Sequence, residues 1–163
     1  TGGADFRLTQ TSAFSANASL FVYGTDTVDG VEQFEVGNQI KVALQYIHQT
    51  GFQTIRVLTR YRSQEKSTLP VVNGQSEQLQ ILPSRATLQS RYSTRLADQV
   101  RLGLFASGQW YDETEAFGSK TLLAGGATVQ LAVGNGFSIV PRVAYTTGSI
   151  TRIEAGLGFV IEQ

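Results

Sequence analysis

The chain contains no cysteine, and this absence removes several kinds of chemistry at once. Without Cys there is no disulfide framework, no thiol nucleophile and no thiolate ligand for a metal ion. Histidine is almost as scarce, with His48 alone, so a metal site would have to be built from carboxylates. We therefore expect no metal and no cofactor. A run of about 18 apolar residues is also missing, which excludes a membrane-spanning helix.

A surplus of charge of either sign is missing as well. The 13 Lys and Arg residues balance the 13 Asp and Glu residues, so the formal net charge is zero. No general attraction to nucleic acid or to an anionic surface follows. Neighbouring Arg and Tyr residues, as in Arg91-Tyr92, do not change this, because adjacent residues of a strand point to opposite faces and cannot form one stacking platform. We expect no nucleic-acid partner.

The sequence does contain a two-residue hydrophobic rhythm. In its clearest copy Ile40, Val42, Leu44 and Tyr46 alternate with polar or small residues. Because side chains alternate across a strand, this pattern predicts a ribbon with one apolar and one polar face. Soluble strands average about five or six residues, whereas a tilted membrane-spanning strand needs roughly 9–11. Eight such stretches lie at about 14–22, 39–46, 54–62, 79–92, 100–110, 123–133, 137–145 and 153–161.

The connections between these stretches alternate in length. Residues 49–51, 96–98 and 134–136 form short turns, whereas 24–35, 63–77 and 112–119 are longer and polar. The last connection, 146–149, is short and departs from the pattern. Short turns at one end and long loops at the other are typical of up-and-down membrane barrels. We predict a single all-β domain, residues 1–163, folded as an eight-stranded antiparallel transmembrane β-barrel.

The positions of aromatic residues favour lipid as the medium around the apolar face. We expect Tyr46 and Tyr92 near the short-turn ends, and Tyr61, Trp110 and Tyr145 near the long-loop ends, as two interfacial girdles. The chain has 10 Arg but only 3 Lys, whereas soluble surfaces are usually rich in lysine. The alternative is a soluble, lipocalin-like barrel, in which the apolar face turns inward around a hydrophobic ligand.

In strand count, girdle positions and connection lengths, the chain resembles the small eight-stranded outer-membrane barrels of the OmpA and OmpX type. The resemblance covers nearly the whole chain and implies a bacterial outer-membrane protein whose main partner is lipid. Such barrels usually finish with an aromatic residue, whereas this chain finishes with Glu162-Gln163. The departure is consistent with a domain excised from a longer protein, in which a partner domain or a partner protein of the same assembly supplies the function.

Most in-strand basic residues fall on the predicted polar face, while most acids lie in the long connections. The predicted lumen charge cluster contains Arg56, Arg60, Arg85, Arg142, Arg152 and Glu154. If the last hairpin turns at 147–149, mirror pairing sets Arg142 directly opposite Glu154. Two interpretations remain open: a plug of hydrogen-bonded arginines, or a narrow anion-selective channel.

The segment around His48 carries the one hint of catalysis. The sequence His48-Gln49-Thr50 is faintly similar to the His-x-Ser arrangement of outer-membrane lipid A deacylases. A hydrolase of that kind needs a nucleophile, a base and an orienting acid, and here Thr stands for Ser and no acid is identifiable. We therefore predict that the protein is not an enzyme but a membrane anchor or a small structural, porin-like module.

Overall fold

The computed structural model describes residues 1–28, 31–70, 76–115, 117–134 and 136–161. Within these ranges every regular element is a β-strand, and the strands form antiparallel sheets. No described segment is a helix of the length and hydropathy that a membrane crossing requires. The all-β prediction is confirmed.

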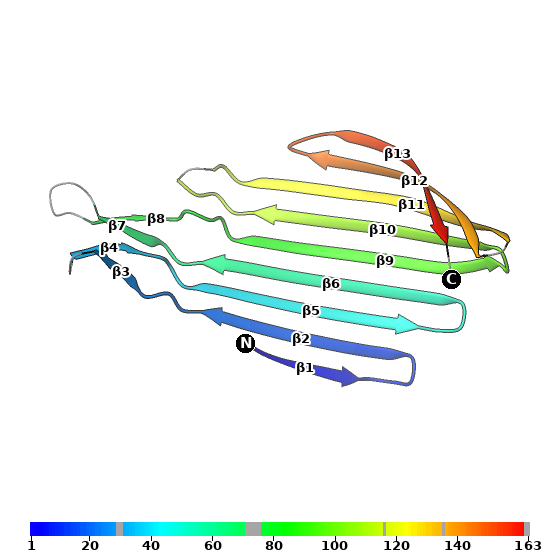
Figure 1. The fold of residues 1–163 in the computed structure, drawn as a ribbon, viewed down its shortest axis with the longest axis horizontal. Coiled ribbons are helices and arrows are strands. Elements are labelled where there is room, and N and C mark those ends of the chain that lie inside the picture. Colours follow the sequence, from blue (N-terminus) through cyan, green and yellow to red (C-terminus); the bar gives the residue numbers. More distant parts are fainter. Residues whose placement is uncertain (29–30, 71–75, 116, 135, 162–163) are drawn as a thin grey trace.

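The main sheet contains nine strands in the order β1-β2-β5-β6-β9-β10-β11-β12-β13 (Figure 1). Except for the six-residue β1, each of them has at least ten residues, which suits a tilted bilayer crossing. Their bounds are Gly2–Arg7 (β1), Ser12–Phe21 (β2), Gln39–Gln49 (β5), Gln53–Gln64 (β6), Arg85–Ala97 (β9), Val100–Tyr111 (β10), Lys120–Gly134 (β11), Phe137–Gly148 (β12) and Arg152–Ile161 (β13).

A second, four-stranded sheet is built from two of the connections that the sequence predicted as loops. It consists of β3 (Thr25–Val28), β4 (Val31–Glu35), β7 (Ser67–Pro70) and β8 (Ser76–Leu79), in that order. Each short strand is next to one long strand in the chain: β3 follows β2, β4 precedes β5, β7 follows β6 and β8 precedes β9. The small sheet therefore extends β2, β5, β6 and β9 beyond their long-loop ends (Figure 1).

Hydrogen bonds at the junction hold this extension in line with the main sheet. The Gly37 amide donates to Ser67 Oγ at 3.1 Å, and Gln64 Nε2 donates to the Gly37 carbonyl at 3.2 Å. Ser67 is 1% exposed, so the junction is well covered although it lies between two sheets. A side chain at position 37 would collide with the backbone of Glu65, so glycine is required there.

The expected count of eight strands is not confirmed, because β1 adds a ninth strand to the main sheet. β1 pairs with β2 from Gly2↔Ala18 to Arg7↔Ala13. The chain reverses just before β2, where the amides of Leu8 and Thr9 both donate to the Ser12 carbonyl. Two glycines at its start weaken the alternating pattern of β1, so the sequence signal is poor there.

The main sheet is not closed into a barrel. Among the described residues no ladder joins β13 to β1 or to β2. An odd number of strictly antiparallel strands makes the two outer strands run in the same direction, so β1 and β13 both run toward the short turns. They cannot pair with each other in an antiparallel ladder. The expected closure of β2 on β13 is absent, because β1 occupies that edge of β2.

The register staggers the strands along the sheet. Tyr46 on β5 and Tyr145 on β12 lie in one cross-strand row, which runs through Val57 and Gly125. Tyr46 is three residues from the short-turn end of its strand, whereas Tyr145 is eight residues from the short-turn end of its own. Barrel closure requires a stagger of this kind, because the strands of a barrel tilt against its axis.

The β1–β2 ladder can be tested by cross-linking, because the chain has no cysteine of its own. Ala4 and Ala16 are directly opposed, and the Cα separation of such a pair, about 4.5 or 5.5 Å, is suitable for a disulfide. We expect the double variant Ala4→Cys, Ala16→Cys to form an intrachain disulfide on mild oxidation, detected by a mobility shift on non-reducing gels.

The matched control is Ala4→Cys with Ala13→Cys, in which the second position is three residues along β2 and roughly 10 Å away. It should remain reduced under the same conditions. Equal oxidation of the two variants, or oxidation of neither, would contradict the ladder.

Candidate functional site

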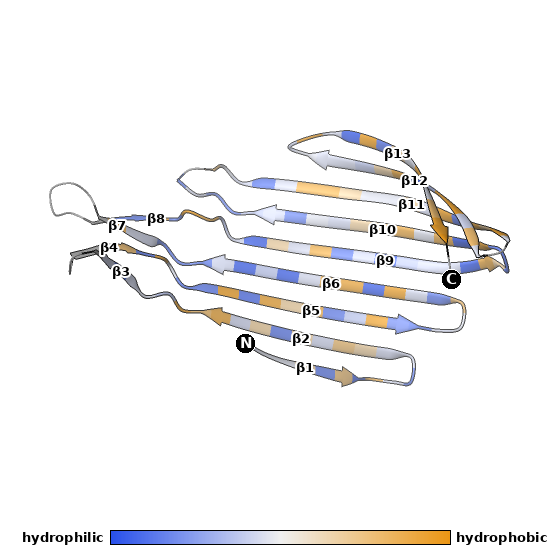
Figure 2. Ribbon diagram, in the orientation of Figure 1, coloured by the Kyte–Doolittle hydropathy of each residue, from blue (hydrophilic) through white to orange (hydrophobic). Residues whose placement is uncertain are grey.

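Among the described residues, no protein layer lies against the apolar face of the main sheet. Residues directly opposed across the strands share a face, so the register groups Leu44, Leu104 and Val143 on the same side. These three side chains are 40–51% exposed although they lie well within their strands. Among the described residues Ala144 is the only buried apolar one. The alternating bands of hydropathy are visible along each strand in Figure 2.

Aromatic side chains lie on this apolar face close to the strand ends. Tyr61, Trp110 and Tyr145 are within three residues of the long-loop ends of β6, β10 and β12. Tyr46 is near the short-turn end of β5, and Tyr92 is five residues from that end of β9. The Trp110 ring covers Gly108, where a Cβ atom would collide with it. Four of the five aromatic residues thus lie near strand ends, whereas Tyr92 lies closer to the middle of β9. Their role as interfacial girdles stays a prediction.

The opposite face of the main sheet is polar and strongly basic. Asp5 and Glu154 are its only acids among the described residues, and they lie on the two outer strands. Several cations directly face one another, as in Arg56↔Arg91, and like charges in that position destabilise a sheet. The basic residues of this face are Arg7, Lys41, Arg56, Arg60, Arg62, Arg85, Arg91, Arg95, Arg101, Lys120, Arg142 and Arg152.

All six members of the predicted lumen cluster lie on this polar face, but not in one place. Arg60 and Arg85 lie toward the long-loop end, and Arg56 lies toward the short turns. The predicted pairing of Arg142 with Glu154 is wrong, because Arg142 is opposite Gly156 and Glu154 is opposite Ala144.

The error in this register has a local cause. β12 continues through Gly148, whose φ of 128° is readily adopted only by glycine. The hairpin is therefore centred one residue later than expected, at position 149, and each residue's partner moves by two positions. Thr146 faces Arg152 as a result.

Glu154 and Arg142 find other partners. Glu154 forms an ion pair with Arg152, two residues away on the same strand, and both side chains remain substantially exposed. A pair of this kind contributes little to stability. The Arg142 guanidinium lies over the Phe105 ring, 5.1 Å from its centroid. Gly126 makes room for this contact, because a Cβ atom there would be 2.6 Å from a Phe105 ring carbon. Arg142 is thus held by a neutral aromatic ring.

At the long-loop end one carboxylate connects three separate segments. Glu115, between β10 and β11, accepts a bond from Lys66 Nζ at 3.0 Å and one from the Gln80 amide at 3.2 Å. Its own backbone amide, the Lys66 ammonium and the Gln80 amide together hold the pKa of this carboxyl below its usual value. Sequence reasoning missed this contact, because its partners are far apart along the chain.

His48 has a partner that the sequence did not reveal. Ser12 on β2 is directly opposite His48 on β5, and Ser12 Oγ lies 2.8 Å from His48 Nδ1 on the apolar face. Within the described residues no carboxylate is hydrogen-bonded to either side chain, so the geometry of a nucleophile, base and acid is incomplete. Thr50 belongs to the adjacent turn, where its hydroxyl accepts a bond from the Gln53 amide at 3.2 Å.

The Glu115 contact generates a pH prediction. The pKa of the Glu115 carboxyl is depressed in the folded state, so its contacts with Lys66 and Gln80 stabilise the long-loop end of the structure at pH values above the ordinary carboxyl pKa. This stabilisation is lost as the pH falls through the depressed value. We expect the protection factor of the Gln80 amide in hydrogen exchange, corrected for the intrinsic rate, to fall in that acid range. Glu115→Gln retains an acceptor but no titratable charge, so its Gln80 protection should not change with pH there. A wild-type profile as flat as that of the variant would contradict the assignment.

Comparison with known proteins does not assign the chain to a family. No family model matches the sequence, and no curated protein or solved structure matches it. The likeness to OmpA and OmpX type barrels therefore depends on architecture alone. Function has to be argued from the two faces of the sheet, their charges and the two open edges.

Proposed function

We propose that the chain forms the wall of a bacterial outer-membrane β-barrel and acts as a membrane anchor or structural, porin-like module. The observation that carries this proposal is the bare apolar face of the main sheet. In water a continuous apolar surface of this kind would be strongly unfavourable. Lipid removes the penalty without a second protein layer. The strand lengths, the aromatic girdles and the stagger of the rows support the same medium.

The polar face turns toward the barrel lumen in this proposal. The hollows of the sheet support this orientation, since two of them, of about 320 and 380 Å³, are lined mainly by polar-face residues such as Arg60 and Arg101. A soluble carrier of a hydrophobic ligand would need its hollow on the apolar face instead. The lipocalin-like alternative is therefore disfavoured.

Closure of the barrel is the finer part of the proposal. In a bilayer an unpaired strand edge leaves backbone groups without partners, so both open edges must be filled. Bacterial single-chain barrels have an even number of antiparallel strands. We propose that β13 pairs antiparallel with β2, as an eight-stranded barrel requires, and that β1 leaves the edge of β2 when it does so. A ring of identical copies does not meet the same requirement, because each seam would join β13 to β1 in parallel.

A narrow anion-selective channel is the second candidate function. The excess of cations over the two acids of the polar face favours it, because a lumen lined by basic side chains attracts anions. The neutral partners of two arginines favour a closed plug. Arg85 Nη2 donates to Gln109 Oε1 at 2.7 Å, and Arg142 lies over Phe105. We place the structural module first for this reason.

The membrane assignment predicts that the folded protein depends on an amphiphile. We expect the chain to be extracted and to remain folded only with detergent or lipid, because the apolar face has no other cover. Circular dichroism and analytical ultracentrifugation, carried out with and without detergent, would measure this. A stable, folded monomer in plain buffer would overturn the proposal.

The orientation of the two faces predicts different costs for arginine at adjacent positions of β6. Val57 lies on the apolar face and Leu58 on the polar face. We expect Val57→Arg to destabilise the membrane-inserted protein by about 2–4 kcal/mol near the bilayer midplane. Leu58→Arg should cost much less, because its charge would enter a hydrated lumen. Reversible urea unfolding from vesicles gives both values, and equal costs would contradict the orientation.

A further inference from the structure

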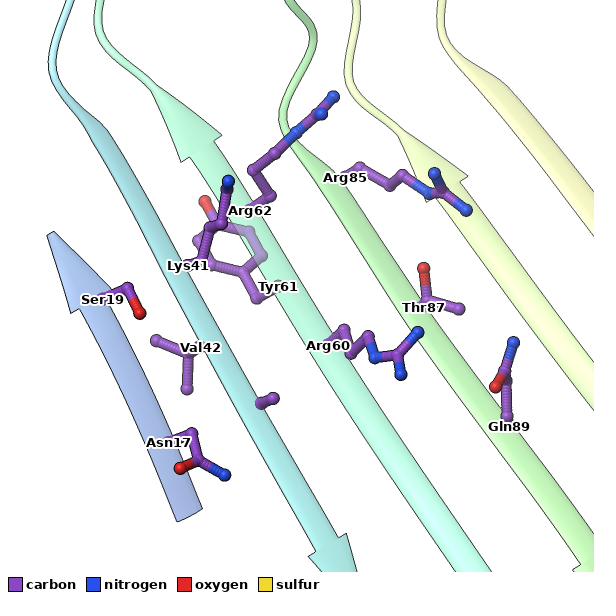
Figure 3. A pocket seen from close by; sticks show the side chains of 11 residues that line it. Asn17, Ser19, Lys41, Val42, Arg60, Tyr61, Arg62, Arg85, Thr87 and Gln89 are labelled. Carbon is purple, nitrogen blue, oxygen red and sulfur yellow. The ribbon is translucent and has the colours of Figure 1, made fainter. Parts of the chain in front are cut away.

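A groove on the polar face gathers four cations from three neighbouring strands. Lys41, Arg62 and Arg85 lie in one cross-strand row of β5, β6 and β9, since each is directly opposite the next. Arg60 lies two residues along β6 on the same face. The groove has a volume of about 320 Å³, and Figure 3 shows these four side chains along it. Polar side chains of β2 and β9, including Asn17 and Thr87, complete the lining.

Nothing anionic within the described residues balances these charges. The partners of Lys41 and Arg85 are neutral: Lys41 Nζ lies 4.3 Å from the Phe21 ring centroid, and the Arg85 guanidinium carbon lies 5.2 Å from that of Tyr111. No ion pair in the described part of the chain involves any of the four. A row of three adjacent cations is unfavourable unless an anion lies between them.

Arg85 supplies a second, independent observation. Its Nη2 is used by Gln109, but its Nε is buried and has no hydrogen-bond partner. A buried donor without a partner costs free energy, and donors left in this state mark places where a ligand or water is expected. The groove therefore has an excess of positive charge, and one of the arginines that line it has a buried donor without a partner.

We propose that this groove binds a water-soluble phosphate ester or oligophosphate anion. Guanidinium groups bind phosphate through paired, charge-assisted hydrogen bonds, and four cations suit a ligand with at least two negative charges better than a single carboxylate. The volume matches the small end of ligand sites, enough for a phosphoryl group and a small organic part.

The position of the groove determines how a ligand reaches it. Lys41 is two residues from the long-loop end of β5, Arg62 is two from that end of β6, and Arg85 begins β9. The groove therefore opens toward the long loops and the four-stranded extension. All four cations lie on the polar face, so anion binding in the groove goes beyond the proposed membrane function and does not depend on what covers the apolar face.

The test is a calorimetric titration of the folded full chain with inorganic pyrophosphate, in detergent or, if the chain is soluble, in plain buffer. We expect saturable binding that Arg62→Gln weakens about tenfold or more, the effect of losing one charge-assisted contact. The control is Arg91→Gln, which also removes one cation from a directly opposed pair on the same face but lies outside the groove. This control should change the affinity by less than about threefold.

Each other outcome overturns the proposal. An equal loss in both variants would mean diffuse attraction by the whole face, and no saturable binding would mean that the cations are purely structural. Dodecyl phosphate serves as the lipid-like probe, and binding of it without pyrophosphate would assign the phosphoryl group to a lipid instead. Because Arg62→Gln relieves repulsion from Arg85, the variant should fold, which circular dichroism verifies before the titration.

Discussion

The need of every strand for a hydrogen-bonded neighbour on each side is the constraint on which the rest of this structure depends. The seven inner strands of the main sheet each have an antiparallel neighbour on both sides. The two outer strands, β1 and β13, have a neighbour on one side only. With nine strands the outer two run in the same direction, so the chain cannot satisfy them against each other as an antiparallel pair. β1, the shortest strand of the main sheet, is held to its partner by only six residue pairs. It is the element whose release costs least.

The faces of the sheet were predictable from the sequence, because the alternation of side chains on a strand is fixed by backbone geometry. Every predicted cluster and girdle residue lies on the expected face. Contacts between distant segments were not predictable: Ser12 meets His48, and Glu115 meets Lys66, only once the register is set. The register itself depended on Gly148, whose positive φ moved the last turn by one residue. The small sheet was missed because strands of four or five residues carry too little alternation.

The arginines of the polar face fall into groups that differ in how their charge is compensated. Arg142 has an aromatic ring and a glycine that makes room for it, and Arg152 has a carboxylate two residues away. These two are satisfied locally and favour a structural role. Lys41 and Arg85 have neutral partners, and among the described residues no carboxylate pairs with any cation of the row Lys41, Arg62 and Arg85. In the proposed lumen a plug and an anion site share one residue: Arg142 belongs to the plug, Lys41 and Arg62 belong to the groove, and Arg85 both donates to Gln109 and lines the groove.

The proposed closure would move charged residues at the outer strands, since both acids of the polar face lie there. In the open sheet Asp5 is carried by β1, opposite Ser15 on β2, and Glu154 is at the far edge on β13. If β13 replaces β1 beside β2, Asp5 leaves the face while the pair formed by Arg152 and Glu154 moves next to β2. Asn17 of β2 lines one side of the basic groove, and β13 would then lie beside that strand. Arg7 leaves together with Asp5, because both lie on the polar face of β1. The net charge of the face is therefore unchanged by the proposed closure, and the excess of cations in the groove does not depend on which outer strand borders β2.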